Sequence, residues 1–189
     1  MHNTDRIFFI GVDLGQRQSN TAFVIVERLD EAPQFTGVLR GEGFTRRYLV
    51  RQAERIPLGT PYQVIVNRLK AIVARLNPQG VCVLVVDSTG IGIPIVELMR
   101  EESVGCRIIP IMITSAEATA PSQTSVPRPA LLTKMQVMAQ RGELQIAAQC
   151  KDAEALRNEL AHLTIDGKSS TGDDMAFALA LACWRAKIR

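Results

Sequence analysis

The stretch RIFFIGVD, residues 6–13, is rich in β-branched and aromatic side chains and ends in an aspartate. This composition predicts a buried β-strand with a carboxylate at its end, followed by a turn at Gly15. A second apolar run, VCVLVV at Val81–Val86, also ends in an aspartate, Asp87. A continuous apolar run is typical of a strand covered on both faces. The two runs together predict an α/β sheet whose buried strands end in carboxylates.

The segments around these two strands alternate between strand and helix patterns. Further extended segments are expected at Asn20–Leu29, Phe35–Phe44 and Arg107–Ile113, with a short one at Leu144–Ile146. Helices are expected at Tyr62–Leu76, Ile93–Glu102, Pro129–Arg141, Asp152–His162 and Asp173–Lys187. The Ser-, Thr-, Ala- and Pro-rich stretch Thr114–Pro129 predicts a long loop. This order predicts a mixed five-stranded sheet, an antiparallel meander plus parallel strands, with helices on both faces.

The length of 189 residues is enough for one domain, and we expect residues 1–189 to form one. Apolar residues make up 47% of the chain and charged residues 22%, which allows a substantial core and argues against global disorder. No apolar run approaches the roughly 18 residues of a membrane span, and no signal peptide is visible. We therefore expect a cytoplasmic protein with no membrane partner.

The cysteines and histidines limit the kinds of metal site that the chain can build. The four cysteines are far apart in sequence and form no C-x-x-C motif: Cys82, Cys106, Cys150 and Cys183. Buried free thiols in a reducing compartment explain them better than disulfides or zinc. The only histidines are His2 and His162, so a histidine-based site is not expected either.

Basic residues are concentrated in one part of the chain, although the net charge is only +3. Residues 40–55 contain five arginines against Glu42 and Glu54: Arg40, Arg46, Arg47, Arg51 and Arg55. Two interpretations remain open for this stretch, a solvated polar face and a phosphate-contacting patch. Arg128 and Lys134 are also candidates for phosphate contact, but a solvated helix face is the favoured interpretation for both.

Three acidic positions adjoin strongly apolar elements. Asp13 and Asp87 end strands, and Asp174, with Asp173 beside it, opens the last helix. Carboxylates are costly to bury unless they are paired or bound to metal, and ligands bind at strand ends in α/β sheets. If the two strands are neighbours, the last helix can bring Asp174 over the other two carboxylates. Such a cluster would need a cation to offset its repulsion.

Carboxylates without histidine or cysteine suit a hard cation, Mg²⁺ or Mn²⁺. Two such ions activate water and stabilise the leaving oxygen in phosphodiester hydrolysis. Simpler roles stay open, because an aspartate at a strand end is often a turn-former. For Asp173 and Asp174, we favour helix capping by one and metal binding by the other.

Several motifs in order along nearly the whole chain resemble the nuclease domain of phage terminase large subunits. They are IGVDLG (10–15), VVDSTGIG (85–92), VPRPALLTKMQVMAQRGELQI (126–146), EALRNELAHL (154–163) and GDDMAFALALA (172–182). The last motif also resembles the closing helix of the RuvC resolvases, which share the ribonuclease-H-like fold. The resemblance implies that fold, with Asp13 bridging two metals, Asp87 as the acid of the fourth strand, and Asp174 or its neighbour Asp173 as the acid of the last helix.

The chain departs from these families in three respects. No G-x-x-x-x-G-K-[ST] motif of an ATPase motor is present, so this chain is not expected to translocate DNA by itself. Phe177 stands where resolvases carry a further aspartate, which puts junction cleavage in doubt. The segment after His162 is short for a terminase, so a DNA-facing hairpin is expected to be trimmed.

The sequence thus predicts a metal-dependent endonuclease that hydrolyses DNA, with a phage or prophage DNA-processing role. Asp13, Asp87 and Asp174 are the expected catalytic residues, and Asp173 joins them as a candidate metal ligand. DNA is the expected partner, and a separate ATPase motor or portal protein is left open. The alternatives are a non-catalytic binding or assembly module of the same fold, a RuvC-like resolvase, and a fragment of a sugar-kinase- or actin-like ATPase.

Overall fold

The computed structural model describes residues 6–15, 19–31, 45–114, 124–163 and 172–188. Its strands are β1 (Ile7–Asp13), β2 (Thr21–Glu31), β3 (Thr45–Ile56), β4 (Val81–Asp87), β5 (Arg107–Thr114), β6 (Ser125–Pro127) and β7 (Leu144–Lys151). Its helices are α1 (Tyr62–Leu76), α2 (Gly92–Glu101), α3 (Arg128–Gln140), α4 (Ala153–His162) and α5 (Asp174–Ala186).

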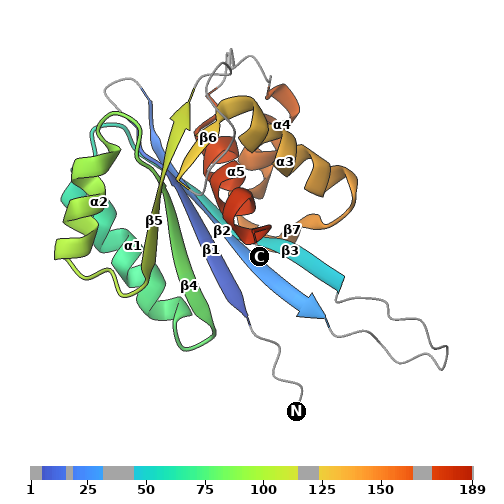
Figure 1. Ribbon diagram of the computed structural model, residues 1–189, viewed down its shortest axis with the longest axis horizontal. Helices are drawn as coiled ribbons and strands as arrows, with labels where there is room; N and C mark the ends of the chain where they lie inside the picture. The colour runs from blue at the N-terminus through green and yellow to red at the C-terminus, as the bar shows by residue number, and fades with distance from the viewer. Residues whose placement is uncertain (1–5, 16–18, 32–44, 115–123, 164–171, 189) are drawn as a thin grey trace.

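The described strands form one mixed sheet in the order β6-β5-β4-β1-β2-β3-β7 (Figure 1). Strands β6, β5, β4 and β1 run parallel to one another, whereas β1, β2 and β3 form an antiparallel meander. Strand β7 pairs in parallel with β3 at the far edge. The two halves meet at β1 and β4, so both apolar runs that end in aspartate lie at the centre of the sheet.

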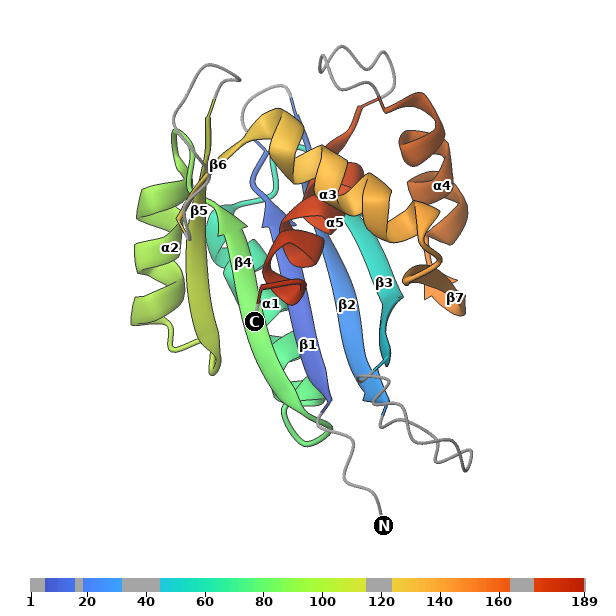
Figure 2. The same cartoon turned by 45° about the vertical axis from the view of Figure 1, so that its right-hand side comes forward.

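Helices cover both faces of the sheet (Figure 2). One face packs against α1 and α2 and contains Phe8, Ile10 and Val12 of β1. The other face packs against α3, α4 and α5 and contains Phe9 of β1. This division follows from the alternation of side chains along a strand. Odd-numbered residues of β1 therefore face α5.

The helices on the two faces bury different amounts of their surface. Helix α1 buries a single stripe, consisting of Ile65, Val66, Leu69, Ile72, Val73 and Leu76, as its helical spacing predicts. Helix α5 is buried nearly all round, with small alanines alternating with larger apolar residues. It packs mainly on β1 and β2 and is covered in turn by α3. This helix is therefore a core element of the fold and not a surface addition.

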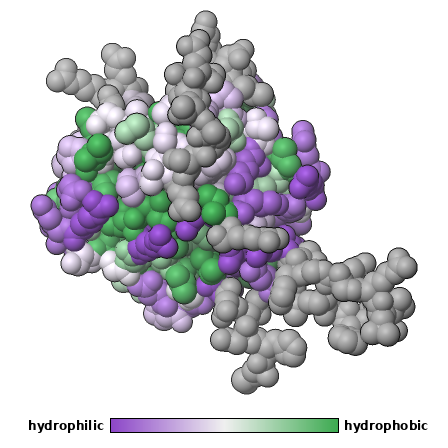
Figure 3. Space-filling view, in the orientation of Figure 1, coloured by the Kyte–Doolittle hydropathy of each residue, from purple (hydrophilic) through white to green (hydrophobic). Residues whose placement is uncertain are grey.

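The apolar surface beside α5 shows where the helix layer ends. Figure 3 shows hydrophobic side chains gathered over β4 and β5. Val81, at the start of β4, is 62% exposed, whereas Val83 and Ile109 further along this face are buried. The helical cover on this side is thus centred on β1 and β2 and thins out toward β4 and β5.

The structure corrects the expected strand count. Seven strands are present in the described residues, not five. The expected strand at Phe35–Phe44 lies outside the described residues, and the third strand of the meander is Thr45–Ile56. Strand β7 is longer than the Leu144–Ile146 segment expected there, and a three-residue strand, β6, lies inside the predicted loop Thr114–Pro129. The α/β class and the mixed sheet are confirmed.

The four cysteines carry no disulfide. Cys82, Cys150 and Cys183 are buried, and Cys106 is partly buried. Burial raises the pKa of all four thiols, to about 11 for Cys82 and Cys106 and to about 12 for Cys183. Across the described residues, none of the helices has the length and apolar character needed to cross a membrane.

Candidate functional site

The register of β1 and β4 places Asp13 beside Asp87. Val12 of β1 lies opposite Val86 of β4 in a parallel pair, and an aspartate is the next residue on each strand. Both strands therefore deliver a carboxylate to the same edge of the sheet. From the sequence, Asp13 and Asp87 were expected side by side only if their strands were neighbours, and β1 and β4 are neighbours.

Both carboxylates also leave the sheet on the side of α5. Asp13 is two residues beyond Gly11 and four beyond Phe9, which belongs to the core under α5. Asp87 is likewise two residues beyond Val85 of the same core. Because side chains alternate along a strand, each aspartate shares the face of these apolar residues. Asp13 and Asp87 therefore point toward the layer in which Asp174 begins α5.

Asp13 carries the strongest electrostatic signature of the site. Its pKa is raised well above the usual value, first by burial and then by the negative charges of Asp87, Asp174 and Asp173. The Arg128 guanidinium opposes this shift. A carboxyl group that feels three like charges is the central member of an acidic cluster. The four acidic residues selected from the sequence are thus close enough to interact electrostatically.

Asp87 also has a local role in the turn that follows β4. The backbone N–H of Thr89 donates to Asp87 Oδ1 at 2.8 Å. An aspartate that accepts a hydrogen bond from the N–H two residues on forms an Asx-turn. The simple turn-forming role therefore holds for Asp87. It uses one carboxylate oxygen and leaves the other without this contact.

Asp174 is buried at the start of α5, with a relative exposure of 6%. Burial raises its pKa, the nearby positive charge of Arg55 opposes the rise, and Asp173 adds to it. The Asn20 side chain donates a hydrogen bond that also opposes the rise. Arg55 Nε lies 3.6 Å from Asp174 Oδ2. Asp174 is thus hydrogen-bonded by Asn20, the residue before β2, and lies near Arg55 of β3, while its charge acts on Asp13.

Asp173 is engaged with a basic residue. Arg128, at the start of α3, donates from Nη2 to Asp173 Oδ2 at 2.8 Å. The same guanidinium lies over the ring of Phe177, 3.9 Å from its centroid. Asp173 occupies the N-cap position of α5 but makes no side-chain capping hydrogen bond. The expected capping by an aspartate is therefore not observed, and Phe177 serves as the apolar platform for Arg128.

Glu159 performs the capping that was expected of an aspartate. It lies on α4 and is 3% exposed. Its Oε2 accepts the backbone N–H of Ala176 at 2.9 Å, one of the donors that the first turn of α5 leaves without a partner. Its Oε1 pairs with Nη2 of Arg55. Sequence reasoning missed Glu159, because a glutamate on an amphipathic helix usually faces solvent.

The arginine-rich stretch is largely neutralised within the fold. On β3, Arg46 pairs with Asp30, Arg51 with the buried Glu27, and Arg55 with Glu159 and Asp174. Arg40 lies outside the described residues. These pairs support neither a plain solvated face nor an open phosphate patch. Lys134, the other candidate phosphate contact, lies 4.1 Å above the Trp184 ring, and burial lowers its pKa.

The acids are near one another but do not form a ready-made ion site. Within the described ranges, no group of three or more His, Cys, Asp and Glu side chains has the arrangement of a metal centre. The donor chemistry nevertheless fits a hard cation, because the group offers carboxylate oxygens and contains neither imidazole nor thiolate. Burial raises the pKa of Asp13 first, and repulsion from Asp87, Asp174 and Asp173 adds to the rise. A bound cation would offset this repulsion.

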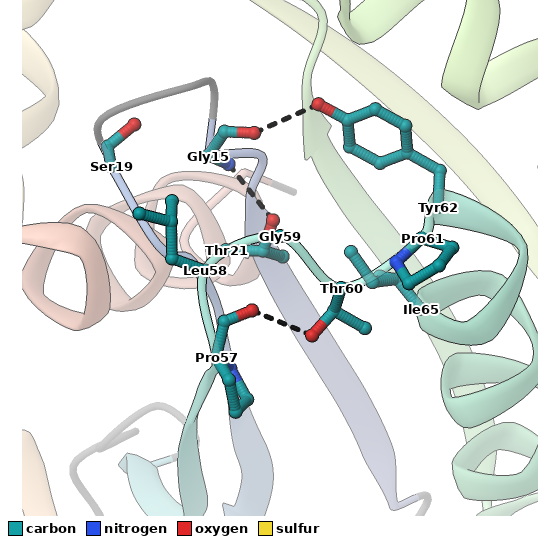
Figure 4. Close-up of a pocket in the computed structure, with 10 residues that line it drawn as sticks. All are labelled: Gly15, Ser19, Thr21, Pro57, Leu58, Gly59, Thr60, Pro61, Tyr62 and Ile65. Atoms are coloured by element: carbon teal, nitrogen blue, oxygen red, sulfur yellow. Dashed lines mark hydrogen bonds between the residues drawn. The ribbon is translucent and has the colours of Figure 1, made fainter.

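A neutral pocket lies on the other side of the turn after β1 (Figure 4). Its volume is about 460 Å³, and it lies between this turn and the loop that leads into α1. The Tyr62 hydroxyl donates to the Gly15 carbonyl at 3.0 Å, and the Gly15 N–H donates to the Thr21 hydroxyl at 3.0 Å. None of its lining residues is acidic or basic. These two hydrogen bonds hold Gly15, two residues after Asp13, in place. The pocket itself offers no charged ligand for a metal or phosphate.

Comparison with known proteins places this architecture. Neither a protein-family description nor a curated protein sequence matches the chain. The large terminase nuclease from the thermophilic phage G20c, whose structure was solved with bound zinc, superposes with a TM-score of 0.61. The two sequences are 20% identical, over 94% of this chain and 80% of that one. The chain has a ribonuclease-H-like fold.

RuvC from Thermus thermophilus is a second structural neighbour, with a TM-score of 0.42 and 15% identity over 93% of this chain and 91% of that one. The resemblance to terminase nucleases noted in the sequence is confirmed at the level of the fold. In this ribonuclease-H-like chain, the acidic cluster lies at the edge formed by the two central parallel strands and the first turn of α5.

Proposed function

We propose that this chain is a metal-dependent endonuclease that hydrolyses DNA phosphodiester bonds. One observation carries the proposal: Asp13, at the end of the central strand, feels the negative charges of Asp87, Asp174 and Asp173. Such a concentration of carboxylates at a half-buried sheet edge destabilises a fold that has no cation to neutralise it. Several carboxylates at one sheet edge are the expected arrangement when divalent ions complete the site.

The candidate ligands are Asp13, Asp87 and Asp174, and the ion is Mg²⁺ or Mn²⁺. These carboxylates are hard oxygen donors that suit both ions. Asp173 is a weaker candidate because one of its oxygens is held by Arg128. Bound ions would activate water for attack on a phosphodiester and stabilise the leaving oxygen.

The protein's own groups would prepare this chemistry. The Asx-turn orients the Asp87 carboxylate from one side of the site. On the other side of the site, the Asn20 side chain orients the Asp174 carboxylate by donating a hydrogen bond to it. Arg128 lies at the margin, where its positive charge acts on Asp13. A site organised by such fixed contacts loses little free energy to rearrangement when substrate arrives.

DNA is the proposed substrate, because the structural neighbour with a TM-score of 0.61 is a terminase nuclease. On the same basis we propose that residues 1–189 act as one nuclease domain with a role in processing phage or prophage DNA. A motor or portal protein as a working partner is a further part of this proposal.

Nicking of supercoiled plasmid DNA tests the proposed activity. The wild-type chain should convert the plasmid to open-circular and linear forms in Mg²⁺ or Mn²⁺, and EDTA should stop the reaction. Asp13→Asn, Asp87→Asn and Asp174→Asn should each reduce the rate by at least about a hundredfold. Glu101→Gln, at the exposed end of α2, is the matched control and should cleave like the wild type.

Two results would overturn the proposal. Cleavage that continues at the wild-type rate in Asp13→Asn would show that the activity comes from elsewhere or from a contaminant. A wild-type chain that binds DNA but never cleaves it in either ion would instead favour a non-catalytic binding module of the same fold.

A further inference from the structure

Glu159 is a buried carboxylate whose two oxygens both have partners. Oε2 accepts the N–H of Ala176 in the first turn of α5, and Oε1 pairs with Arg55. The side chain has a relative exposure of 3%, so it is held away from water between α4 and α5. Burial raises its pKa, and both of these contacts oppose the rise. A buried charge with this set of partners is costly to remove and restricts where its neighbours can lie.

Arg55 lies between two carboxylates and makes a different contact with each. Its Nη2 makes a direct hydrogen bond to Glu159, whereas its Nε is 3.6 Å from Asp174 Oδ2. The second separation is beyond ordinary hydrogen-bond length. The guanidinium is therefore attached to Glu159 and stands close to Asp174 without a direct hydrogen bond to it.

We propose that Glu159 is a positioning residue: it binds the Arg55 guanidinium, keeps it from forming a direct hydrogen bond with Asp174, and so leaves the Asp174 carboxylate available to a divalent ion. This inference rests on the proposed metal-dependent function. It assigns a role to two residues, on β3 and α4, that lie outside the expected acidic set. The role is indirect, because Glu159 acts through Arg55 and through the first turn of α5.

The physical reason is competition for one carboxylate. Arginine binds a carboxylate through two parallel N–H donors, and this pairing is stronger than a single neutral hydrogen bond. Without the charge at position 159, the nearest carboxylate to the Arg55 guanidinium is Asp174. An ion pair formed there would use the oxygens that an ion needs and would cancel part of the negative charge that attracts it. Glu159 prevents this by supplying the closer partner.

Titration of the metal-free protein with Mn²⁺ measures the effect directly. We expect Glu159→Gln to weaken Mn²⁺ binding by about tenfold, the lower end of the range for residues that orient metal ligands. The glutamine retains an acceptor for the Ala176 N–H, so the first turn of α5 keeps its cap. Calorimetry, or the electron paramagnetic resonance of free Mn²⁺, reports the dissociation constant without any need for cleavage.

A second variant separates positioning from a general structural role. In Arg55→Gln/Glu159→Gln, the competing cation and its anchor are both absent. We expect its Mn²⁺ dissociation constant to return to within about threefold of the wild type, whereas purely structural damage would make the double variant at least as weak as Glu159→Gln. If Glu159→Gln fails to fold, Arg55→Gln alone still tests the inference and should bind Mn²⁺ at least as tightly as the wild type.

Glu27 supplies a matched control. It is also a fully buried glutamate, paired with Arg6 and Arg51, but it lies opposite Phe8, near the start of β1. Asp13 is five residues further along that strand, roughly 16 Å away at the rise of an extended chain. Glu27→Gln should lower thermal stability and leave the Mn²⁺ dissociation constant unchanged. A loss of Mn²⁺ affinity in this control equal to that of Glu159→Gln would overturn the positioning role.

The two proposals fail in different ways. A wild-type chain that neither binds Mn²⁺ nor cleaves DNA contradicts the proposed function itself. A wild-type chain that binds Mn²⁺, with Glu159→Gln binding it equally well, contradicts only the role of Glu159. Cleavage supplies a further distinction, because excess Mn²⁺ should restore the rate of Glu159→Gln if the defect lies in ion binding alone.

Discussion

The carbonyl oxygen of Ala178 occupies the space into which a side chain on Gly11 would extend. A Cβ added at Gly11 would stand 1.8 Å from that oxygen and 2.8 Å from the backbone nitrogen of Ala182. The backbone of α5 therefore lies directly against the backbone of β1. This contact is one turn beyond Asp174 on the helix and two residues before Asp13 on the strand, so it also sets how closely these two acids approach.

Gly11→Ala should therefore be severely destabilising. The methyl group meets backbone atoms that cannot rotate away, so α5 must move off the sheet or the chain must unfold. We expect the free energy of unfolding to fall by at least about 3 kcal/mol, the upper end of the usual range for overpacked cores. Denaturant unfolding followed by circular dichroism measures this change.

Gly59→Ala is the comparison for this substitution. Gly59 has a φ of +81° and no other atom within 4 Å of an added Cβ, so only the left-handed backbone opposes a side chain there. The expected cost is about 1–2 kcal/mol. Equal destabilisation at the two positions would show that α5 does not pack directly on the β1 backbone.

Asp13→Asn should change the pH dependence of stability as well as cleavage. Burial and the neighbouring acids raise the folded-state pKa of Asp13 above 3.8, so the unfolded chain ionises first as pH rises. Stability of the metal-free wild type is therefore lost as pH rises from about 4 through the raised pKa, and the loss persists above it. An asparagine side chain does not ionise, so the variant should be the more stable protein at neutral pH.

Thermal unfolding across a pH series, in EDTA and in Mn²⁺, measures this effect. Mn²⁺ should raise the melting temperature of the wild type far more than that of Asp13→Asn, because the ion stabilises the ionised cluster. A variant that is less stable than the wild type at neutral pH in EDTA would contradict the repulsion attributed to Asp13. An equal response of both proteins to Mn²⁺ would remove Asp13 from the ion site.

The thiols offer a test of the core that does not involve the proposed activity. Burial raises the pKa of Cys82 and Cys106 to about 11 and that of Cys183 to about 12. At about pH 8, little thiolate is present to attack a disulfide reagent such as Ellman's reagent. The folded protein should react slowly, and the denatured protein should release four equivalents rapidly. Rapid reaction of Cys183 in the folded protein would contradict the burial of α5.

Much of the site followed from local patterns in the sequence. Apolar runs that end in aspartate predicted β1 and β4, and the pairing of the two strands brought Asp13 next to Asp87. The apolar character of residues 173–187 correctly predicted a buried helix with acids at its start. These features could be predicted because each depends on one continuous stretch of sequence whose apolar composition indicates burial.

Other features depend on contacts between distant segments. Strand β3 was missed because its arginines interrupt the apolar pattern. Its pairing with β2 also shifts register between Ile25 and Val26, where Arg51 is the extra residue on β3. Its arginines become compatible with a strand only through partners elsewhere, such as Glu27 on β2 and Glu159 on α4. No local pattern marks Glu159. It lies 104 residues from Arg55 in the sequence, and the two side chains meet only in the folded protein.

The two adjacent acids at the start of α5 should differ in their effect on cleavage. Asp173 is tied to Arg128 by a hydrogen bond of 2.8 Å, whereas Asp174 is buried and faces the other acids. We expect Asp173→Asn to lower the plasmid-nicking rate by no more than about tenfold, because its main effect is to release Arg128. Asp174→Asn removes a proposed ligand and should lower the rate by at least about a hundredfold. Arg128→Gln breaks the same contact but leaves the negative charge of Asp173 in place. This variant should match Asp173→Asn in nicking rate, and both variants should show a small loss of stability. The reverse order, with Asp173→Asn the more damaging change, would make Asp173 the ligand and Asp174 the partner that Arg55 neutralises.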